Sequence, residues 1–512
     1  MKLFKLSRLL KIAALFLCML LIILPVFACN SSEKPPNSEN NNNINNNNDD
    51  SIKNDVQPDG EDSQPPDESQ SRLDVSDDLP DEDFGGSKFN ILYLTWGTYT
   101  DYYWAAEEIG EVMNDALYRR QRDVGERFNV EIEPIPTDYG TLMTKMGKSV
   151  KAGSHDYDMA LTHYSNELAA LITGNIILDW NKIPHLNFDK PWWSSKNAEN
   201  EGLALNGKMY LVVSDFVIPD PNVTFFNKDL HKDLSLEDPY QLVRDGKWTY
   251  GKMHELAKAA GKDLNGDGQM TDADQYGLVT QLGWYFNSTA NSAGLKAVAP
   301  DETGRLVYTD EVERIHNAII AVDDIVNDKT CTFTYAYGAM GDQYISALPL
   351  STGQVLFHWD PLFRALYYRS LDFDYGILPW PKLDDAQSRY YHFSHNGFMV
   401  LPQTTPDLDK AGIIVEALSA MSYKYVLPAY YDILMGIKLT RDLDSVEMLN
   451  LVYETCVFDP GRNYLEGSDP MCAGFYDLIS KGNTDYISYH EKFVGKTQAW
   501  LDKFYDKVLE LD

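Results

Sequence analysis

From Lys88 onward, short apolar runs of strand length alternate with longer segments that repeat apolar residues at helical spacing. The expected strands are residues 89–94, 130–132 and 157–161, and the expected helices between them are residues 112–128 and 142–150. A chain that alternates strand and helix in this way builds a sheet of parallel strands covered by helices. The alternation therefore predicts an α/β fold.

The first 28 residues have the pattern of an export signal. Four basic residues precede the apolar run 12–28, and Val26-Phe27-Ala28-Cys29 follows. This ending resembles a bacterial lipobox, although Phe27 stands where that pattern prefers a small residue. The resemblance implies that residues 1–28 are a signal peptide, that Cys29 carries the lipid, palmitate included, and that the protein is held at the extracytoplasmic face of the cell membrane. An uncleaved anchor or an ordinary secretory signal is the alternative.

Residues 29–87 are of low complexity. They hold an asparagine run, several prolines and, over residues 30–87, sixteen acidic residues against three basic ones. Such a composition cannot bury enough apolar surface to order itself. We expect a disordered, acidic tether that charge repulsion keeps extended.

One loop has the ligand order of an EF-hand calcium site. Oxygen donors fall at alternating positions at the start of the loop, and Gly268 stands at the sixth position, where such a loop turns sharply. The predicted Ca²⁺ ligands are Asp263, Asn265, Asp267, Gln269 through its carbonyl, Thr271 and Asp274. Asp274 stands where the usual loop has a longer, bidentate Glu, and a polar turn without metal is the alternative. The loop occurs once, between a helix and the strand 276–280, so the predicted ion is structural and does not indicate a paired calcium sensor.

The net charge limits the kinds of partner that the chain can bind, and the cysteine count bears on its disulfides. The net charge of −33 disfavours nucleic acids and other polyanions. Beyond the signal and Cys29, the chain has three cysteines, Cys331, Cys456 and Cys472. An odd number of cysteines favours free, buried thiols, with a Cys456–Cys472 disulfide as the alternative. Tyrosine and tryptophan are abundant, which suits either an ordinary core or rings that stack on sugars.

A set of stretches in a fixed order resembles the extracellular solute-binding proteins of the carbohydrate type, the capture subunits of ABC importers. Each stretch is short, but together they cover nearly all of residues 88–512. They are Tyr157-Asp158-Met159-Ala160, Gly174-Asn175-Ile176-Ile177-Leu178-Asp179-Trp180, Pro191-Trp192-Trp193, Phe225-Phe226-Asn227-Lys228-Asp229-Leu230, Trp248-Thr249, Gly353-Gln354-Val355-Leu356-Phe357, Tyr375-Gly376-Ile377-Leu378-Pro379-Trp380-Pro381-Lys382 and Lys438-Leu439-Thr440-Arg441-Asp442.

The resemblance implies a two-lobed periplasmic-binding-protein fold of type II, with ligand held in a cleft between lobes that several chain crossings connect. We expect lobe 1 to comprise residues 88–218 and 341–395. Lobe 2 then comprises residues 219–340 and 396–512, with the C-terminal helices. Closure of the lobes over a ligand would give the form that a transporter recognises.

Ligand contacts are expected in loops that follow strand ends and at the crossings. The predicted residues are Trp96, Tyr99, His163, Tyr164, Asp220, Asn222, Trp284, Asn287, Trp359, Asp360, His395 and Asn396. Aromatic rings would stack on sugar faces and polar groups would pair with hydroxyls. The predicted function is non-catalytic capture of a sugar or oligosaccharide for permease subunits. A secreted glycoside hydrolase, with two carboxyls set across the bond it cleaves, or a surface adhesion or signalling module on the same fold, is the alternative.

Overall fold

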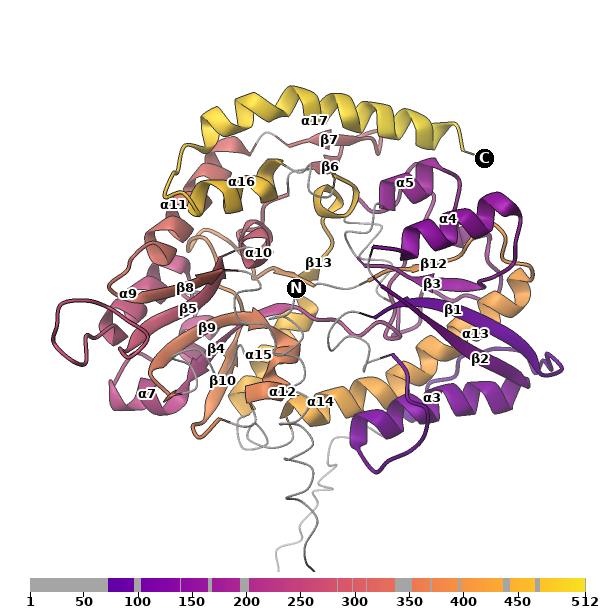
Figure 1. Cartoon of the computed structure of the whole chain (residues 1–512), viewed down its shortest axis with the longest axis horizontal. Helices are drawn as coiled ribbons and strands as arrows, with labels where there is room; N and C mark the ends of the chain where they lie inside the picture. The colour runs from indigo at the N-terminus through magenta and orange to yellow at the C-terminus, as the bar shows by residue number, and fades with distance from the viewer. Residues whose placement is uncertain are drawn as a thin grey trace, which may run out of the picture. The chain divides into compact units, whose positions relative to one another are not determined.

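Two β-sheets organise the folded part of the chain (Figure 1). The structure is a computed structural model that describes residues 72–95, 103–138, 140–163, 168–193, 202–282, 284–296, 298–309, 311–336, 352–368, 371–394, 397–435, 443–465 and 470–511. All of these residues belong to one compact unit, Pro66–Asp512. Within the described ranges, no helix is both long enough and apolar enough to cross a membrane.

Lobe 1 is the part built on the first sheet, from residues 72–219 and 397–421. Its strands lie in the order β12 (Met399–Val400), β3 (Met159–Leu161), β1 (Ser87–Leu94) and β2 (Val130–Thr137). β1 runs parallel to both β2 and β3, while β12 pairs antiparallel with β3. The helices α3 (Val112–Phe128), α4 (Leu142–Ala152), α5 (Leu168–Thr173) and α13 (Leu408–Met421) complete this lobe. The expected βα alternation is confirmed.

The ends of α3 show why the sequence predicted this helix so well. The side chain of Glu111 accepts a hydrogen bond from the backbone N–H of Asn114 at 2.8 Å and so caps the first turn. Asn129 ends the helix with a φ of 47°, in the left-handed region that asparagine tolerates. The buried residues of the helix, among them Leu117, Val124 and Phe128, recur at helical spacing.

Lobe 2 is the part built on the second sheet, from residues 220–394. Its strands lie in the order β10 (Tyr375–Leu378), β4 (Asn222–Asn227), β9 (Val355–Pro361), β5 (Tyr276–Leu282) and β8 (Thr332–Ala336). β5 is parallel to β8 and β9, whereas β4 is antiparallel to β9 and β10. The helices α7 (Lys228–Asp233), α8 (Pro239–Arg244), α9 (Tyr250–Ala260), α10 (Trp284–Ser292) and α11 (Val312–Val326) belong here, with the hairpin β6 (Val298–Pro300) and β7 (Leu306–Tyr308).

A glycine sets how closely α9 lies on the second sheet. A Cβ atom at Gly277 in β5 would stand 2.0 Å from the carbonyl oxygen of Ala257 in α9. No side chain fits at that distance, so the close approach of helix and strand requires glycine there. Ala257 and Ala260 keep the helix face small on the same side, and both are fully buried.

The C-terminal part contacts both lobes. The π-helix η6 (Ser422–Val426) and α14 (Leu427–Met435) contact α3 of lobe 1, whereas α15 (Leu443–Glu454) packs on β10 of lobe 2. The strand β13 (Cys456–Val457) pairs with β11 (His392–Phe393), and η7 (Gly461–Leu465) and α16 (Pro470–Ile479) follow. The last helix, α17 (Tyr486–Leu509), contacts α11, α16 and β7 of the lobe 2 side and also α5 of lobe 1 (Figure 1).

The strand pairing corrects the expected division of the chain. Residues 341–395 were assigned to lobe 1, but β9 and β10 from this range pair with β4 and β5 and so belong to lobe 2. Residues 396–512 were assigned to lobe 2, but β12 pairs with β3 of lobe 1. The buried side chains of α13, such as Ile414 and Leu418, pack with those of β1. The chain therefore returns to lobe 1 only after Ser394.

The ordered fold also begins earlier than residue 88. Residues 72–86 lie against lobe 1, where Val75, Leu79 and Phe84 pack on its core. Asp77 is only 8% exposed and forms an ion pair with Arg127 of α3 at 2.5 Å. The end of the acidic segment thus uses its apolar residues and one carboxylate to bind α3, which corrects the expected tether boundary at residue 87. Cys29 and residues 1–71 lie outside the described residues.

Candidate ligand-binding site

The first crossing from lobe 1 to lobe 2, at residues 220–222, lies beside the return of the chain at Ser394. Pro221 forms an isolated bridge with Ser394. The backbone N–H of Asp220 donates to the Ser394 hydroxyl at 2.9 Å, and the Asp220 carboxylate accepts from the N–H of Phe363 at 3.0 Å. Through these hydrogen bonds the buried Asp220 holds the crossing together. It lies where ligand contacts were predicted.

Asn222 begins β4 directly after the crossing and is almost fully buried. Its Nδ2 donates to the hydroxyl of Ser288 in α10. Its Oδ1 is buried without a hydrogen-bond partner among the described residues. A buried acceptor without a donor is costly, so this oxygen is suited to receive a hydrogen bond from a ligand hydroxyl or a bound water.

A second polar cluster, which the sequence did not reveal, comprises Asn291 of α10, Asp459, Arg462 of η7 and Lys296. Asn291 Nδ2 donates to Asp459 Oδ2 at 2.6 Å, while Asn291 Oδ1 is buried with no partner among the described residues. Burial raises the pKa of Asp459, and the hydrogen bond from Asn291 and the charges of Arg462 and Lys296 oppose that shift. These residues come from segments far apart in the sequence, which is why no motif marked them.

His163 connects this cluster to lobe 1, since it lies two residues after the end of β3. Loss of hydration lowers its pKa to about 3, and the positive charge of Arg462 adds to the shift. His163 is therefore a neutral imidazole near pH 7, with one ring nitrogen that donates a hydrogen bond and one that accepts. The Arg462 guanidinium lies 4.1 Å from the ring centre of Phe393, which keeps the cation beside the second crossing.

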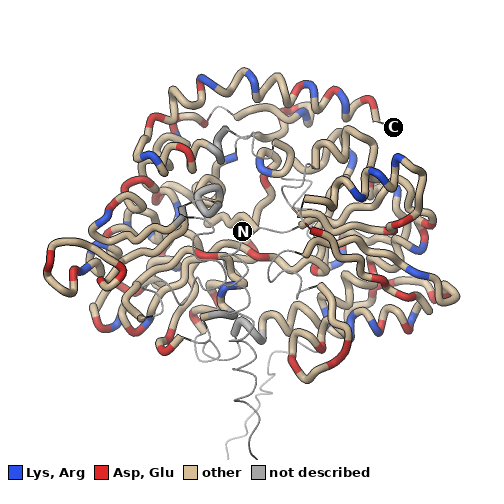
Figure 2. Tube along the Cα trace, in the orientation of Figure 1, with Lys and Arg blue, Asp and Glu red and all other residues tan. Residues whose placement is uncertain are grey.

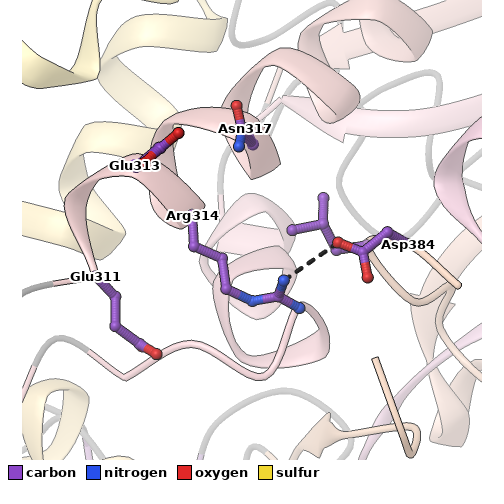
Figure 3. A pocket seen from close by; sticks show the side chains of 6 residues that line it. Glu311, Glu313, Arg314, Asn317 and Asp384 are labelled. Atoms are coloured by element: carbon purple, nitrogen blue, oxygen red, sulfur yellow. Dashed lines mark hydrogen bonds and ion pairs between the residues drawn. The ribbon is translucent and has the colours of Figure 1, made fainter. Parts of the chain in front are cut away.

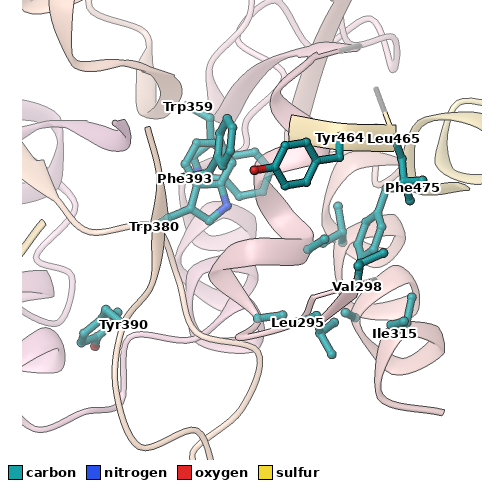
Figure 4. Packing of buried hydrophobic residues seen from close by; sticks show 14 of the residues in the cluster. Leu295, Val298, Ile315, Trp359, Trp380, Tyr390, Phe393, Tyr464, Leu465 and Phe475 are labelled. Carbon is teal, nitrogen blue, oxygen red and sulfur yellow. The ribbon is translucent and has the colours of Figure 1, made fainter. Parts of the chain in front are cut away.

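Trp359 lies in the core, which does not fit the predicted stacking on a sugar. It is fully buried, and its ring stacks on Trp380 with centroids 4.9 Å apart (Figure 4). Tyr250 of α9 meets its edge, and the Tyr250 hydroxyl accepts from Trp380 Nε1 at 2.8 Å. Both β9 faces are covered, so Trp359 has no free ring face to offer a ligand.

Asp360, the next residue of β9, is also fully buried and points to the opposite face of the strand. It accepts a hydrogen bond from the Tyr368 hydroxyl at 2.7 Å, and His358 Nδ1 lies 3.7 Å from the same carboxylate. Burial lowers the pKa of His358 to about 4, with the Asp360 charge opposing the shift. The expected contact of Asp360 with ligand is thus replaced by an internal network.

The other predicted ligand residues divide into two groups. Trp284 and Asn287 were expected in a loop but lie in α10, because the helix begins directly after β5. The remaining residues lie outside the described part of the chain and stay predictions: Trp96, Tyr99, Tyr164, His395 and Asn396.

One surface pocket lined by described residues lies away from the crossings. It has a volume of about 310 Å³ and opens at the start of α11, where Arg314 pairs with Asp384 at 3.2 Å beside Glu311 and Glu313 (Figure 3). None of its lining residues belongs to the predicted ligand set. Acidic and basic residues are interspersed over the helices of both lobes (Figure 2), and such exposed, mixed charge does not mark a site.

The calcium-type loop folds around its own carboxylates. Asp263 accepts from the N–H groups of Gly266 and Gly268, both at 2.7 Å, and these glycines have φ values of 73° and 80°. Asp267 accepts from the Gln269 N–H at 2.8 Å. The fully buried Asp274 accepts from Leu264 and Thr271, and these hydrogen bonds lower its pKa.

The donor set of this loop has the hard oxygens that Ca²⁺ prefers. In this structure, however, the carboxylates of the loop are not clustered around a common point. Among the described residues, the one group of three His, Cys, Asp or Glu side chains whose ligand atoms all lie within 4.8 Å of one another is elsewhere, at His254, Asp328 and Cys331. Ion binding at the loop would therefore require Asp263, Asp267 and Asp274 to close inward.

No protein-family model and no curated protein sequence matches the chain. Solved structures do. One is the galacto-N-biose/lacto-N-biose I-binding protein of the ABC transporter from Bifidobacterium longum, in complex with lacto-N-biose. It is 12% identical with a TM-score of 0.53, over 80% of this chain and 98% of that one.

Two further structures are similar over most of their length. An ABC substrate-binding protein from Listeria monocytogenes in complex with cycloalternan has 14% identity and a TM-score of 0.51, covering 83% of this chain and 98% of its own. A sugar transporter protein from Rhizobium etli in an open conformation has 12% identity and a TM-score of 0.54, covering 83% and 100%. These likenesses confirm the two-lobed fold of periplasmic binding proteins.

Proposed function

We propose that this chain is the extracytoplasmic capture protein of an ABC importer, binding a sugar or oligosaccharide without altering it. The observation that carries the proposal is structural: proteins described as binding lacto-N-biose and cycloalternan for ABC transport share the fold over at least 80% of this chain and 98% of their own. Ligand would be held between the lobes, and closure would present the loaded form to permease subunits.

Polar groups beside the crossings support a hydroxyl-rich ligand. The buried oxygens Asn222 Oδ1 and Asn291 Oδ1 have no partner among the described residues. Sugar hydroxyls are donors that would satisfy them, and the neutral His163 adds one more hydrogen-bonding group from the lobe 1 side. Of the ligand residues predicted from the sequence, we assign ligand contact to His163, Asp220 and Asn222. We add Asn291, which the sequence did not indicate.

The test is a thermal-shift panel of glycans on the purified protein, followed by titration calorimetry. A ligand that binds the native state raises the melting temperature by mass action. Asn222→Leu keeps the branched shape but removes the acceptor and the donor of the amide, so we expect at least tenfold weaker binding. Asn317→Ala, at an exposed position of α11, is the control and should bind normally. A protein that binds no glycan, or releases reducing ends from a polysaccharide, would contradict the proposal.

Anchoring follows from the sequence. We propose that Cys29 carries the lipid and that the protein stays at the outer face of the cell membrane. Labelled fatty acid should be incorporated into the wild type and not into Cys29→Ser. Wild-type protein that takes up no label would refute the anchor.

The loop at residues 263–274 is proposed to bind one Ca²⁺. The six predicted donors supply hard oxygens, and the two left-handed glycines allow the turn that gathers them. Ca²⁺ should raise the melting temperature and chelator should reverse it, whereas Asp263→Ala combined with Asp267→Ala should be insensitive to both. Asp272→Ala, an exposed loop acid outside the donor set, should respond like the wild type. A wild-type melting curve that calcium does not move counts against the ion.

A further inference from the structure

Three metal-ligating side chains from separate segments meet at the edge of lobe 2. His254 lies on α9, while Asp328 and Cys331 lie in the turn between α11 and β8. One ligand atom from each lies within 4.8 Å of the other two. His254 Nε2 and Asp328 Oδ2 are 2.9 Å apart. No motif joins these residues, because α9 and this turn are far apart in the sequence.

The fold holds each of the three in place. Asp328 Oδ1 accepts from the N–H and the hydroxyl of Thr330, at 3.1 and 2.5 Å, which leaves Oδ2 directed at His254. The Thr332 hydroxyl donates to the Ile325 carbonyl at 2.6 Å and so fixes the chain on the other side of Cys331. The group is thus set on a packed helix and a strand end.

Packing also fixes the position of α9 against this turn. A Cβ at Gly261, just after α9, would stand 2.5 Å from the Thr330 carbonyl oxygen and 3.0 Å from Cys331. Helix and turn therefore touch through their backbones, and His254 reaches Asp328 from the middle of the same helix.

The burial of the group leaves one side open. Cys331 is fully buried, whereas His254 and Asp328 are 17% and 21% exposed. Among the described residues, the polar contacts of the sulfur are long, 3.8 Å to the Asp328 carbonyl and 3.8 Å to the Thr332 hydroxyl. A small ion entering from the solvent side would meet an imidazole and a carboxylate first and the thiolate at the bottom.

We infer that His254, Asp328 and Cys331 form a binding site for one Zn²⁺-class transition-metal ion. Nitrogen, oxygen and sulfur together are the ligand types that zinc takes, at about 2.0–2.3 Å each, so two of its ligands lie no more than about 4 Å apart. The present spacing needs to contract by less than about an ångström, while the His254–Asp328 pair opens slightly. Solvent supplies the fourth ligand.

This site differs from the calcium-type loop in chemistry and in residues. The loop offers only oxygens, which suit Ca²⁺, while thiolate and imidazole exclude Ca²⁺ and favour Zn²⁺. Burial raises the pKa of the Cys331 thiol to about 11, so binding must displace its proton. The ion would tie α9 to the α11–β8 turn and so stiffen lobe 2 without touching the crossings.

Cobalt substitution tests the inference on the purified full chain. We expect Co²⁺ to bind at one equivalent with a near-ultraviolet thiolate-to-cobalt charge-transfer band, and Zn²⁺ to displace it. Cys331→Ser should abolish the band, and His254→Gln should weaken metal binding at least tenfold, as loss of a ligand does. Cys456→Ser, at a second free thiol away from this group, is the matched control and should keep the band.

Two results would overturn the site. The first is a wild-type chain that shows no charge-transfer band. His254 and Asp328 would then form just an ion pair beside a buried thiol. The second is a band that persists unchanged in Cys331→Ser, which would place the sulfur ligand at another cysteine. Should Cys331→Ser fail to fold by circular dichroism, His254→Gln and zinc-edge X-ray absorption of the wild type decide instead. One sulfur with nitrogen and oxygen neighbours supports the site, and a shell of oxygen and nitrogen alone refutes it.

Discussion

Glu416 in α13 is a buried carboxyl whose replacement should reveal how lobe 1 is stabilised. It is 0% exposed and accepts hydrogen bonds from Trp192 Nε1 at 3.0 Å and Trp193 Nε1 at 2.9 Å. The N–H of Asn187 approaches the second oxygen at 3.3 Å. Both carboxyl oxygens thus accept hydrogen bonds from donors at a site that is closed to solvent.

Glu416→Gln keeps the shape but replaces one acceptor by an NH₂ group. One of the two indole N–H groups would then face a donor, and a buried unsatisfied donor costs about 1–3 kcal/mol. We expect the free energy of unfolding to fall by about that amount near pH 4.5. Trp193→Phe removes the stranded donor, so in the Gln background it should cost less than in the wild type.

The pH dependence gives a second, independent sign. Burial raises the pKa of Glu416 from 4.5 to about 7. Between these values the unfolded chain has lost the proton that the folded chain still holds, so stability of the wild type falls as pH rises. At 1.36 kcal/mol per pH unit, the deficit of Glu416→Gln should shrink by up to about 3 kcal/mol between pH 4.5 and 7.

Urea unfolding followed by tryptophan fluorescence at several pH values measures both effects. Glu454→Gln, at an exposed position of α15, is the control and should follow the wild type at each pH. A deficit of Glu416→Gln that grows as pH rises would refute the reasoning, because it would mean that the folded protein favours the ionised carboxylate.

Two packing predictions follow from the core. Trp359→Ala should lower the free energy of unfolding by about 3–5 kcal/mol, as for large core residues. Trp500→Ala, 37% exposed on α17, should cost much less in the same urea titration, and equal effects would contradict the core packing of Trp359. Gly277→Ala should destabilise strongly because its Cβ meets Ala257, while Gly495→Ala, with open space around it in α17, should stabilise by about 0.5–1 kcal/mol; a harmless Gly277→Ala would contradict the close packing.

Local patterns in the sequence predicted the elements, but not which strands pair. The limits of α3 were read correctly because amphipathic spacing and the Asn129 terminus are local signals. The assignment of β9 to lobe 1 was wrong because an apolar run indicates a buried strand but does not show which strands it pairs with. Pairing of β9 with β4 and β5 depends on contacts between distant segments, which the spacing of apolar residues does not encode.

The site was harder to predict for a related reason. Polarity suggested that Asp360 reaches solvent or ligand, yet a strand covered on both faces buries every residue, and its carboxylate is satisfied by Tyr368. Asp220 and Asn222 lie at the crossing, as predicted, because a chain crossing has a recognisable position relative to β4; their contact with ligand stays a prediction. Asn291 and Asp459 were missed because their pairing arises only when α10 and the segment before η7 fold together.

Because residues 72–86 are attached to lobe 1, lobe 1 is the lobe that stays fixed relative to any support that holds the N-terminal side of the chain. A pull on the chain ahead of residue 72 is transmitted through Asp77 to Arg127 and through Phe84 to the end of α3. If the lobes close on a ligand as we propose, a protein fixed by its N-terminal side would keep lobe 1 in place with the support, and lobe 2 would move. A fluorophore on α9 would then report displacement relative to the surface, whereas one on α3 would stay still.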